Sequence, residues 1–192
     1  MSASTRAWFI TVYISGNLFF SGNARTDSLF EPGEGSSKTW RVAGAYLLQG
    51  MGRICEGLAA AEQGDNKSVA GFMSEGEAKL KNAAATYEAL AKEISDPRKI
   101  NFEQFATLDP DVASRMKDAA AKHIFEIPQD EKQAAALALK EVKAFSDWLE
   151  KNSDSISKLK LMVLQQLISK MIRVQWIGAD VAVLMHEGLE KK

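Results

Sequence analysis

Apolar residues recur every three or four positions through most of the chain, which is the spacing of a single helix face. The longest such run extends from Ser155 to Glu187, and a second apolar row beside the first widens the apolar arc to about half of the helix circumference. From Trp176 to Met185 only Asp180 is charged, so this half should be covered nearly all round. The pattern predicts a long core helix, whose main row is Ile156, Leu159, Val163, Leu167, Met171, Val174, Gly178, Val181 and Met185.

Two earlier stretches have the same periodicity and predict a tight antiparallel pair of helices. The first begins at about Thr39 and is stopped by the Gly-Asp-Asn turn at 64–66, and the second follows at once and ends at the Asp-Pro pair at 96–97. Small residues on the inward rows should let the two backbones approach closely, at Gly44, Gly76 and Ala83.

The middle of the chain should supply a third long element. An acidic cap followed by proline, Asp109 and Pro110, is a strong helix start. Pro128 interrupts the following helical pattern but leaves too little chain for a reversal, so the piece before it and the piece after it, up to the turn at 152–154, should continue in one direction. Three apolar residues in the connection before this element should plug one end of the fold, namely Phe102, Phe105 and Leu108.

These elements predict an all-α protein, and no strand pattern competes with them. We expect an up-down-up-down four-helix bundle whose third element is bent or broken at Pro128, which makes five helical segments. The bundle should form one domain over residues 39–192.

The beginning of the chain has a different character. Arg6 precedes a mostly apolar run at 7–20, and small residues at Gly22 and Ala24 match the positions that a signal peptidase reads. We therefore expect residues 1–24 to be a signal peptide that is cleaved after Ala24, residues 25–38 to be a flexible leader, and the mature protein to be periplasmic or secreted. An uncleaved anchor is the alternative, but the run is shorter than the ~20 apolar residues of a membrane-spanning helix, so no stable membrane span is expected after processing.

Charge and cysteine content narrow the classes of partner. The formal net charge is -1 and no basic run is long enough to follow a phosphate backbone, so nucleic acid is not expected as a partner. The single cysteine, Cys55, cannot form an internal disulfide.

Three cofactor sites can be compared with the sequence. A di-iron site needs Glu three residues before each histidine, but Ala120 and Val183 precede His123 and His186. A phosphate-binding loop at 32–39 lacks glycine at both required ends. A haem or metal site that uses His123, His186 and core methionines stays as the alternative function, although a partly buried His123, a His186 at a fraying helix end and gap-filling methionines are the expected roles. The methionines are Met51, Met73, Met116, Met162, Met171 and Met185.

No catalytic constellation emerges. Cys55 lies beside the inward row of its helix, where a free cysteine behaves as a small apolar side chain. The Ser-x-x-Lys match at 155–158 should simply open the last helix. We therefore predict that the protein is not an enzyme and holds no cofactor.

The remaining candidates are polar residues on inward arcs. Lys160, Gln175 and Glu141 are expected to set the register or to extend their polar ends to the surface. Asp180 needs an Arg or Lys partner if it is buried. We predict a non-enzymatic binding or interaction module whose partner is another protein, a small ligand or a second copy in a homodimer, with an interaction surface formed by Trp40, Trp176, Asp180 and Leu184.

Overall fold

The computed structural model of this chain describes residues 36–158 and 160–189, and within these ranges every regular element is a helix. The all-α prediction is therefore confirmed for this part of the chain. The predicted number of elements was wrong, because the described residues form six helices when the continuous run α8–η1–α9 is counted as one. The elements are α3 (Ser36–Glu62), α4 (Asn66–Glu93), α5 (Phe102–Leu108), α6 (Pro110–Ala121), α7 (Glu131–Ser157), α8 (Leu161–Trp176), the π-helical turn η1 (Ile177–Val181) and α9 (Ala182–Glu187).

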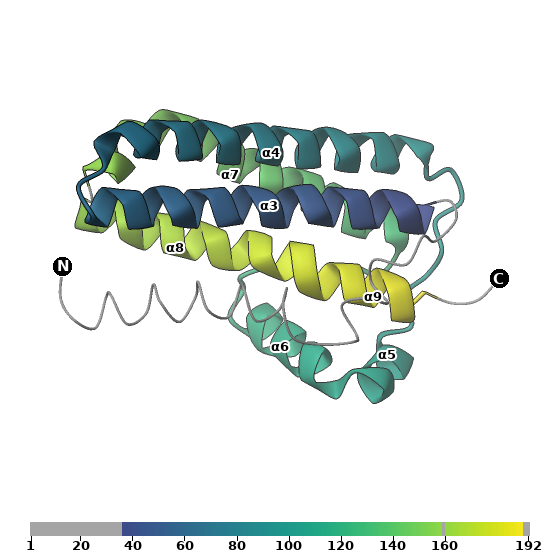
Figure 1. Cartoon of the computed structure of the whole chain (residues 1–192). Helices are drawn as coiled ribbons and strands as arrows, with labels where there is room; N and C mark the ends of the chain where they lie inside the picture. The colour runs from purple at the N-terminus through teal and green to yellow at the C-terminus, as the bar shows by residue number, and fades with distance from the viewer. Residues whose placement is uncertain (1–35, 159, 190–192) are drawn as a thin grey trace.

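The long helices α3, α4, α7 and α8 lie side by side, and each runs opposite to the one before it (Figure 1). The short helices α5 and α6 lie outside this bundle, beneath α8 and α9 in the same view. The core is one continuous apolar cluster, and its largest fully buried side chains include Tyr87, Phe105 and Phe145. None of the described helices combines the length and hydrophobicity that crossing a bilayer requires.

The predicted long third element does not exist, because α6 ends at Ala121 and α7 begins only at Glu131. The connection between them runs back to the end of the bundle where α4 ends, and there it pairs with the segment that follows α4. The Ile100 N–H donates to the carbonyl of Gln129 at 3.0 Å, and the Glu131 N–H donates to the carbonyl of Arg98 at 3.0 Å. Pro128 lies inside this non-helical connection, where it is buried and bends no helix. The third long helix of the bundle is therefore α7 alone.

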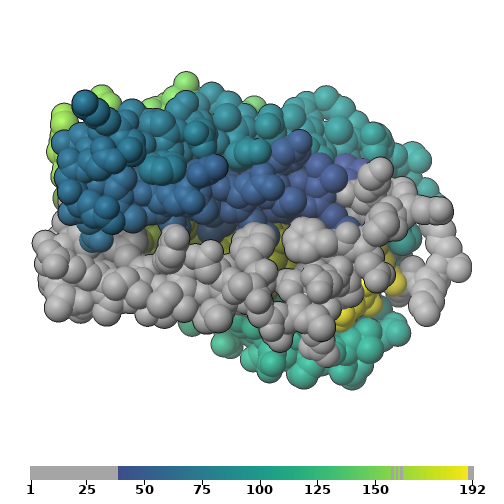
Figure 2. Space-filling view, in the orientation of Figure 1, coloured from purple at the N-terminus to yellow at the C-terminus, as the bar shows by residue number. Residues whose placement is uncertain are grey.

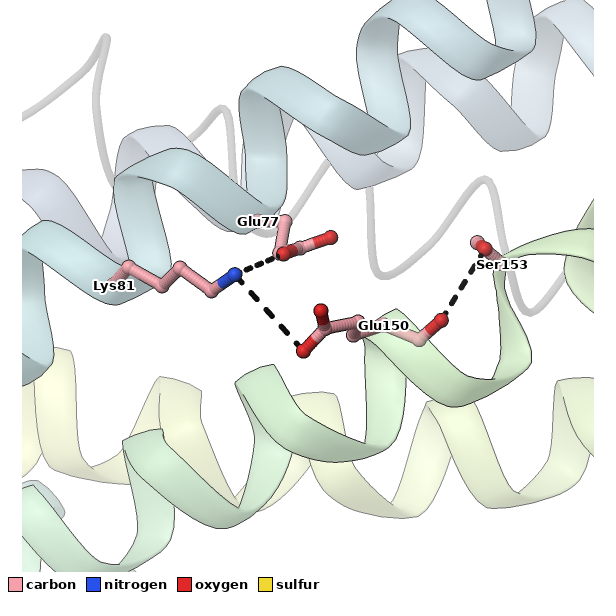
Figure 3. Close-up of polar contacts among 4 residues, drawn as sticks. All are labelled: Glu77, Lys81, Glu150 and Ser153. Atoms are coloured by element: carbon pink, nitrogen blue, oxygen red, sulfur yellow. Dashed lines mark hydrogen bonds and ion pairs between the residues drawn. The ribbon is translucent and has the colours of Figure 1, made fainter.

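The boundary before the last helix also differs from the prediction. The polar residues at 152–154 were expected to form a turn, but α7 continues through them to Ser157, and α8 begins at Leu161. The side chain of Asn152 donates to the carbonyl of Trp148 at 2.8 Å, and that of Ser153 donates to the carbonyl of Glu150 at 3.4 Å (Figure 3). Such bonds to the preceding turn leave the helix intact. The Ser-x-x-Lys stretch therefore closes α7 and does not open a helix.

The helices α3 and α4 pack closely enough that glycine is required between them. A Cβ atom on Gly76 would lie 2.9 Å from Cγ1 of Ile54 and 3.1 Å from the carbonyl oxygen of Gly50. The space-filling view shows the two helices lying against each other in the upper part of the molecule (Figure 2). The close approach expected at Gly76 is confirmed, whereas Gly44 faces the carbonyl of Gly178 in η1.

A surface contact joins α4 to α7. The ammonium group of Lys81 pairs with Glu77 on its own helix and lies 3.9 Å from a carboxylate oxygen of Glu150 on α7 (Figure 3). All three side chains are at least partly exposed, so this contact contributes little to stability.

The structure bears on the expected leader, on the expected plug and on the cap of α6. The helix α3 begins at Ser36, so the last three residues of the expected leader are helical, while residues 1–35, with the expected cleavage site, lie outside the described residues. In α5, Phe105 is buried as expected of a plug, but Leu108 is 52% exposed. The acidic cap of α6 is confirmed, because Asp109 accepts a hydrogen bond from the N–H of Val112 at 3.2 Å.

Candidate functional site

The predicted interaction surface is covered by the chain itself. Trp40, Trp176, Asp180 and Leu184 are all buried, with exposed fractions of 3%, 6%, 7% and 0%. The segment from α5 to residue 127 packs against the end of the last helix. These four residues are therefore part of the core and not a free docking face.

The cover over the last helix is apolar at its centre. The ring of Phe125 stacks on that of Trp176, and three residues of α6 turn inward. Pairing α6 with the bundle explains why the segment from 176 to 185 carries almost no charge. The inward residues of α6 are Val112, Ala113 and Met116.

Asp180 has the cationic partner that its burial requires. The guanidinium group of Arg115, on α6, donates to Asp180 at 2.8 Å through Nη2 and at 3.4 Å through Nε. Burial raises the pKa of Asp180 above its ordinary value, Arg115 acts in the opposite direction, and the charge of Asp109 raises the pKa further. The expected partnership is therefore confirmed, and it joins α6 to η1.

Both histidines lie at the surface of the protein. His123 is exposed and has a φ of 52°, so the expected partly buried position on a helix face was wrong. His186 is exposed in α9. Among the described residues, no group of three or more His, Cys, Asp or Glu side chains is arranged to hold a metal ion. Five of the six methionines considered are buried, and Met162 is 74% exposed.

Cys55 is a half-buried thiol on α3. Burial raises its pKa to about 11, and the nearby charge of Glu56 adds to this shift. The side chain is therefore a protonated thiol at neutral pH, as expected of a small apolar residue.

A surface groove lies between α7 and α8. It has a volume of about 650 Å³ and is lined by one row of side chains from each helix. Within each row, residues three or four positions apart lie on one face of the helix, and this face borders the groove. The α7 row is Lys140, Glu141, Ala144, Phe145 and Trp148, and the α8 row is Gln166, Ser169, Lys170 and Arg173.

The charges in this groove are held by neighbours on both helices. The guanidinium group of Arg173 lies 3.5 Å from a carboxylate oxygen of Glu141, whose side chain is only 15% exposed. The ammonium group of Lys170 lies 5.6 Å from the centre of the Trp148 ring, a cation–π geometry. With Lys140, the lining contains three cations and one carboxylate.

The sequence contained only part of the signal for this groove. Glu141 was recognised as a polar residue on an inward arc, and the structure explains it through Arg173. Arg173 and Ser169 gave no such signal, since the face that α7 presents to α8 cannot be read from either helix alone. The other two polar residues on inward arcs take no part, because Lys160 is exposed and Gln175, which is half-buried, does not line the groove.

Comparisons with known proteins gave no match, since no protein-family model fits the chain and neither a curated protein nor a solved structure is significantly similar to it. The function of the groove is therefore inferred from its own residues.

Proposed function

We propose that the protein is a non-enzymatic helical-bundle module that binds its ligand or partner in the groove between α7 and α8. The observation that carries this proposal is the set of charged residues that line the groove from both helices. The facing rows place four charged residues beside the rings of Phe145 and Trp148. The groove also has the size of ordinary ligand sites, which enclose roughly 300–1,000 Å³.

The lining supports binding more readily than catalysis. Ser169 is the only lining residue with a hydroxyl group, and none of the lining residues is a histidine that could activate it. Trp148 and Phe145 supply an apolar wall, and the charged and amide groups supply orientation. This combination of an apolar wall and a few polar groups is typical of recognition sites.

The proposal is tested by recording amide and indole NMR spectra of the labelled full chain during titration with a panel of small anions, cations, neutral sugars and short peptides. We expect one class to shift the Trp148 indole and the Gln166 side-chain amide selectively, while signals of remote exposed residues such as Lys67 stay in place. A panel in which ligands perturb only other surfaces would contradict the proposal.

We also propose that the protein is exported, on the basis of the targeting pattern at 6–24. The expected mature chain begins at Arg25 and is found outside the cytoplasm. Intact-mass measurement of fractionated cells checks this, and recovery of residues 1–24 in a membrane fraction would favour an anchor.

A further inference from the structure

The α7–α8 groove carries more positive than negative charge. Lys140, Lys170 and Arg173 line it together with a single carboxylate, Glu141, which lies beside Arg173. In the described part of the chain, no ion pair involves Lys140 or Lys170, which come from opposite walls. Two positive charges are therefore in excess, one on each side of the groove.

The surroundings of these charges strengthen their effect on an anion. Among the lining residues Phe145 is fully buried and Trp148 is half-buried, and low-dielectric walls of this kind focus the field of nearby charges. Lys170 is held over the Trp148 ring, and Arg173 is held by Glu141. Both side chains are therefore partly ordered already, and a ligand that binds them loses less free energy to side-chain entropy. Gln166 and Ser169 add neutral hydrogen-bond donors to the α8 wall.

The dimensions of the groove exclude a long polyanion. The α7 row spans residues 140–148, which is about 12 Å at 1.5 Å per residue. The net charge of the whole chain is -1, so the chain as a whole does not attract a long polyanion. A compact ligand with two negative charges matches the excess charge, and an apolar part on that ligand would contact Trp148 and Phe145.

We infer that the α7–α8 groove binds a small organic dianion, such as a phosphate monoester, through Lys140, Lys170 and Arg173, with Trp148 against its apolar part. This inference rests on the proposed function, since it names the ligand class of the same site.

The inference is tested by calorimetry with the full chain and four probes, namely phenyl phosphate, inorganic phosphate, benzoate and benzyl alcohol. We expect phenyl phosphate to bind most tightly, inorganic phosphate more weakly because it lacks the ring, and both affinities to fall with added salt. The double variant Lys140→Gln/Lys170→Gln should weaken phenyl phosphate binding by about tenfold or more, as the loss of charge-assisted contacts predicts. The matched control Lys67→Gln, at an exposed position on α4, should leave binding unchanged.

Circular dichroism and unfolding midpoints establish that the variants are folded. The variant Trp148→Phe, which keeps an aromatic ring, should retain most of the affinity for phenyl phosphate. Vesicles containing phosphatidate separate a free ligand from a lipid headgroup that bears the same phosphate. The inference is overturned if benzoate binds as tightly as phenyl phosphate, if Lys67→Gln weakens binding as much as the groove variant, or if only vesicles bind. Should the dianions fail while another class shifts the groove signals in the NMR panel, the proposed function stands and the ligand class is wrong; should nothing reach the groove, both are wrong.

Discussion

Two residues occupy the same left-handed backbone position just beyond a helix, Gly64 after α3 and His123 after α6. Beyond α3, the N–H groups of Gly64 and Asp65 donate to the carbonyls of Ala61 and Ala60. Beyond α6, those of His123 and Ile124 donate in the same pattern to Ala120 and Ala119. Both ends are Schellman motifs, in which glycine is the usual residue at the left-handed position.

His123→Gly should stabilise the protein by about 0.5–1 kcal/mol, because glycine relieves the left-handed strain but gives the unfolded chain more freedom. Urea unfolding of the full chain measures the change. Gly64→Ala is the matched control at the equivalent position, and it should destabilise the protein by about 1–2 kcal/mol. A loss of stability on His123→Gly would show that the backbone at His123 is unstrained.

Arg115→Gln should destabilise the protein at neutral pH, because it leaves the carboxylate of Asp180 buried without its cation. Breaking a fully buried pair costs about 3–5 kcal/mol, but the Arg115 side chain is 46% exposed, so a loss of about 1–2 kcal/mol is expected. Urea unfolding at pH 7 measures it. The double variant Arg115→Gln/Asp180→Asn should recover much of the loss, since it removes the unpaired charge.

The cost of Arg115→Gln should also decrease as the pH falls. The pKa of Asp180 is already raised by burial, and removing Arg115 takes away the main influence that lowers it. A carboxyl with a raised pKa binds its proton more readily in the folded than in the unfolded state, so the folded state of the variant gains stability as the pH falls through that pKa. Unfolding curves at pH 7 and at about pH 4 compare the two conditions, and a cost that grows on acidification would contradict this account.

At the scale of elements, the pairing of α3 with α4 depends on the absence of side chains at their crossing. Gly50 and Gly76 face each other, and a Cβ on Gly50 would lie 3.0 Å from the carbonyl oxygen of Gly76. The neighbouring atoms are backbone or belong to buried Leu80 and Ile54, so little movement can relieve the overlap. Helix propensity alone favours alanine at both sites, and packing opposes it.

Gly76→Ala should destabilise the protein by about 1–3 kcal/mol, because the overlap outweighs the gain in helix propensity. Gly71→Ala, on the same helix with nothing within 4 Å of the new atom, should instead stabilise it by up to about 1 kcal/mol. Thermal and urea unfolding of both variants give the comparison. If the two substitutions change stability in the same direction, the helix crossing is looser than the structure indicates.

The last helix shows how one element adapts to two neighbours. Its π-helical turn η1 contains Gly178, where a Cβ would lie 3.0 Å from Cδ2 of Leu47 on α3. The same turn presents Asp180 to Arg115 on α6. The periodicity of the sequence predicted a helix here but not the π-helical turn. This turn lies where the helix contacts α3 on one side and α6 on the other, and both are tertiary contacts.

At the scale of the whole molecule, the segment 98–101 determines the path of the chain. It pairs with the start of α7 through Ile100 and Glu131, and with the end of α9 through the Asn101 N–H, which donates to the carbonyl of Gly188 at 2.8 Å. The Arg98 guanidinium group adds two hydrogen bonds to the buried carboxylate of Glu131, at 3.3 and 3.2 Å. The connection after α6 must return to this point, so α5 and α6 are left to pack on the outside of the bundle (Figure 1).

The candidate groove is also a property of the assembled molecule. Glu141 stood out in the sequence because a charge on an inward arc is unusual, but its partner Arg173 lies thirty-two positions further along, on another helix. The buried aromatic and acidic residues chosen from the sequence, Trp176 and Asp180, were correctly recognised as needing cover and a cation. Both needs are met inside the chain, by Phe125 and Arg115.

The sequence by itself determined what depends on near neighbours. Apolar spacing of three and four residues established helices and their buried faces, and capping residues such as Gly64 and Asp109 marked several ends, because each of these signals acts within one or two turns. The tertiary structure alone decided where Pro128 lies, which surface α6 covers, and that α7 and α8 face each other across a groove lined by charged and aromatic side chains. Those outcomes depend on pairings between distant segments, whose free energy comes from hydrogen bonds and burial that exist only once the helices have packed.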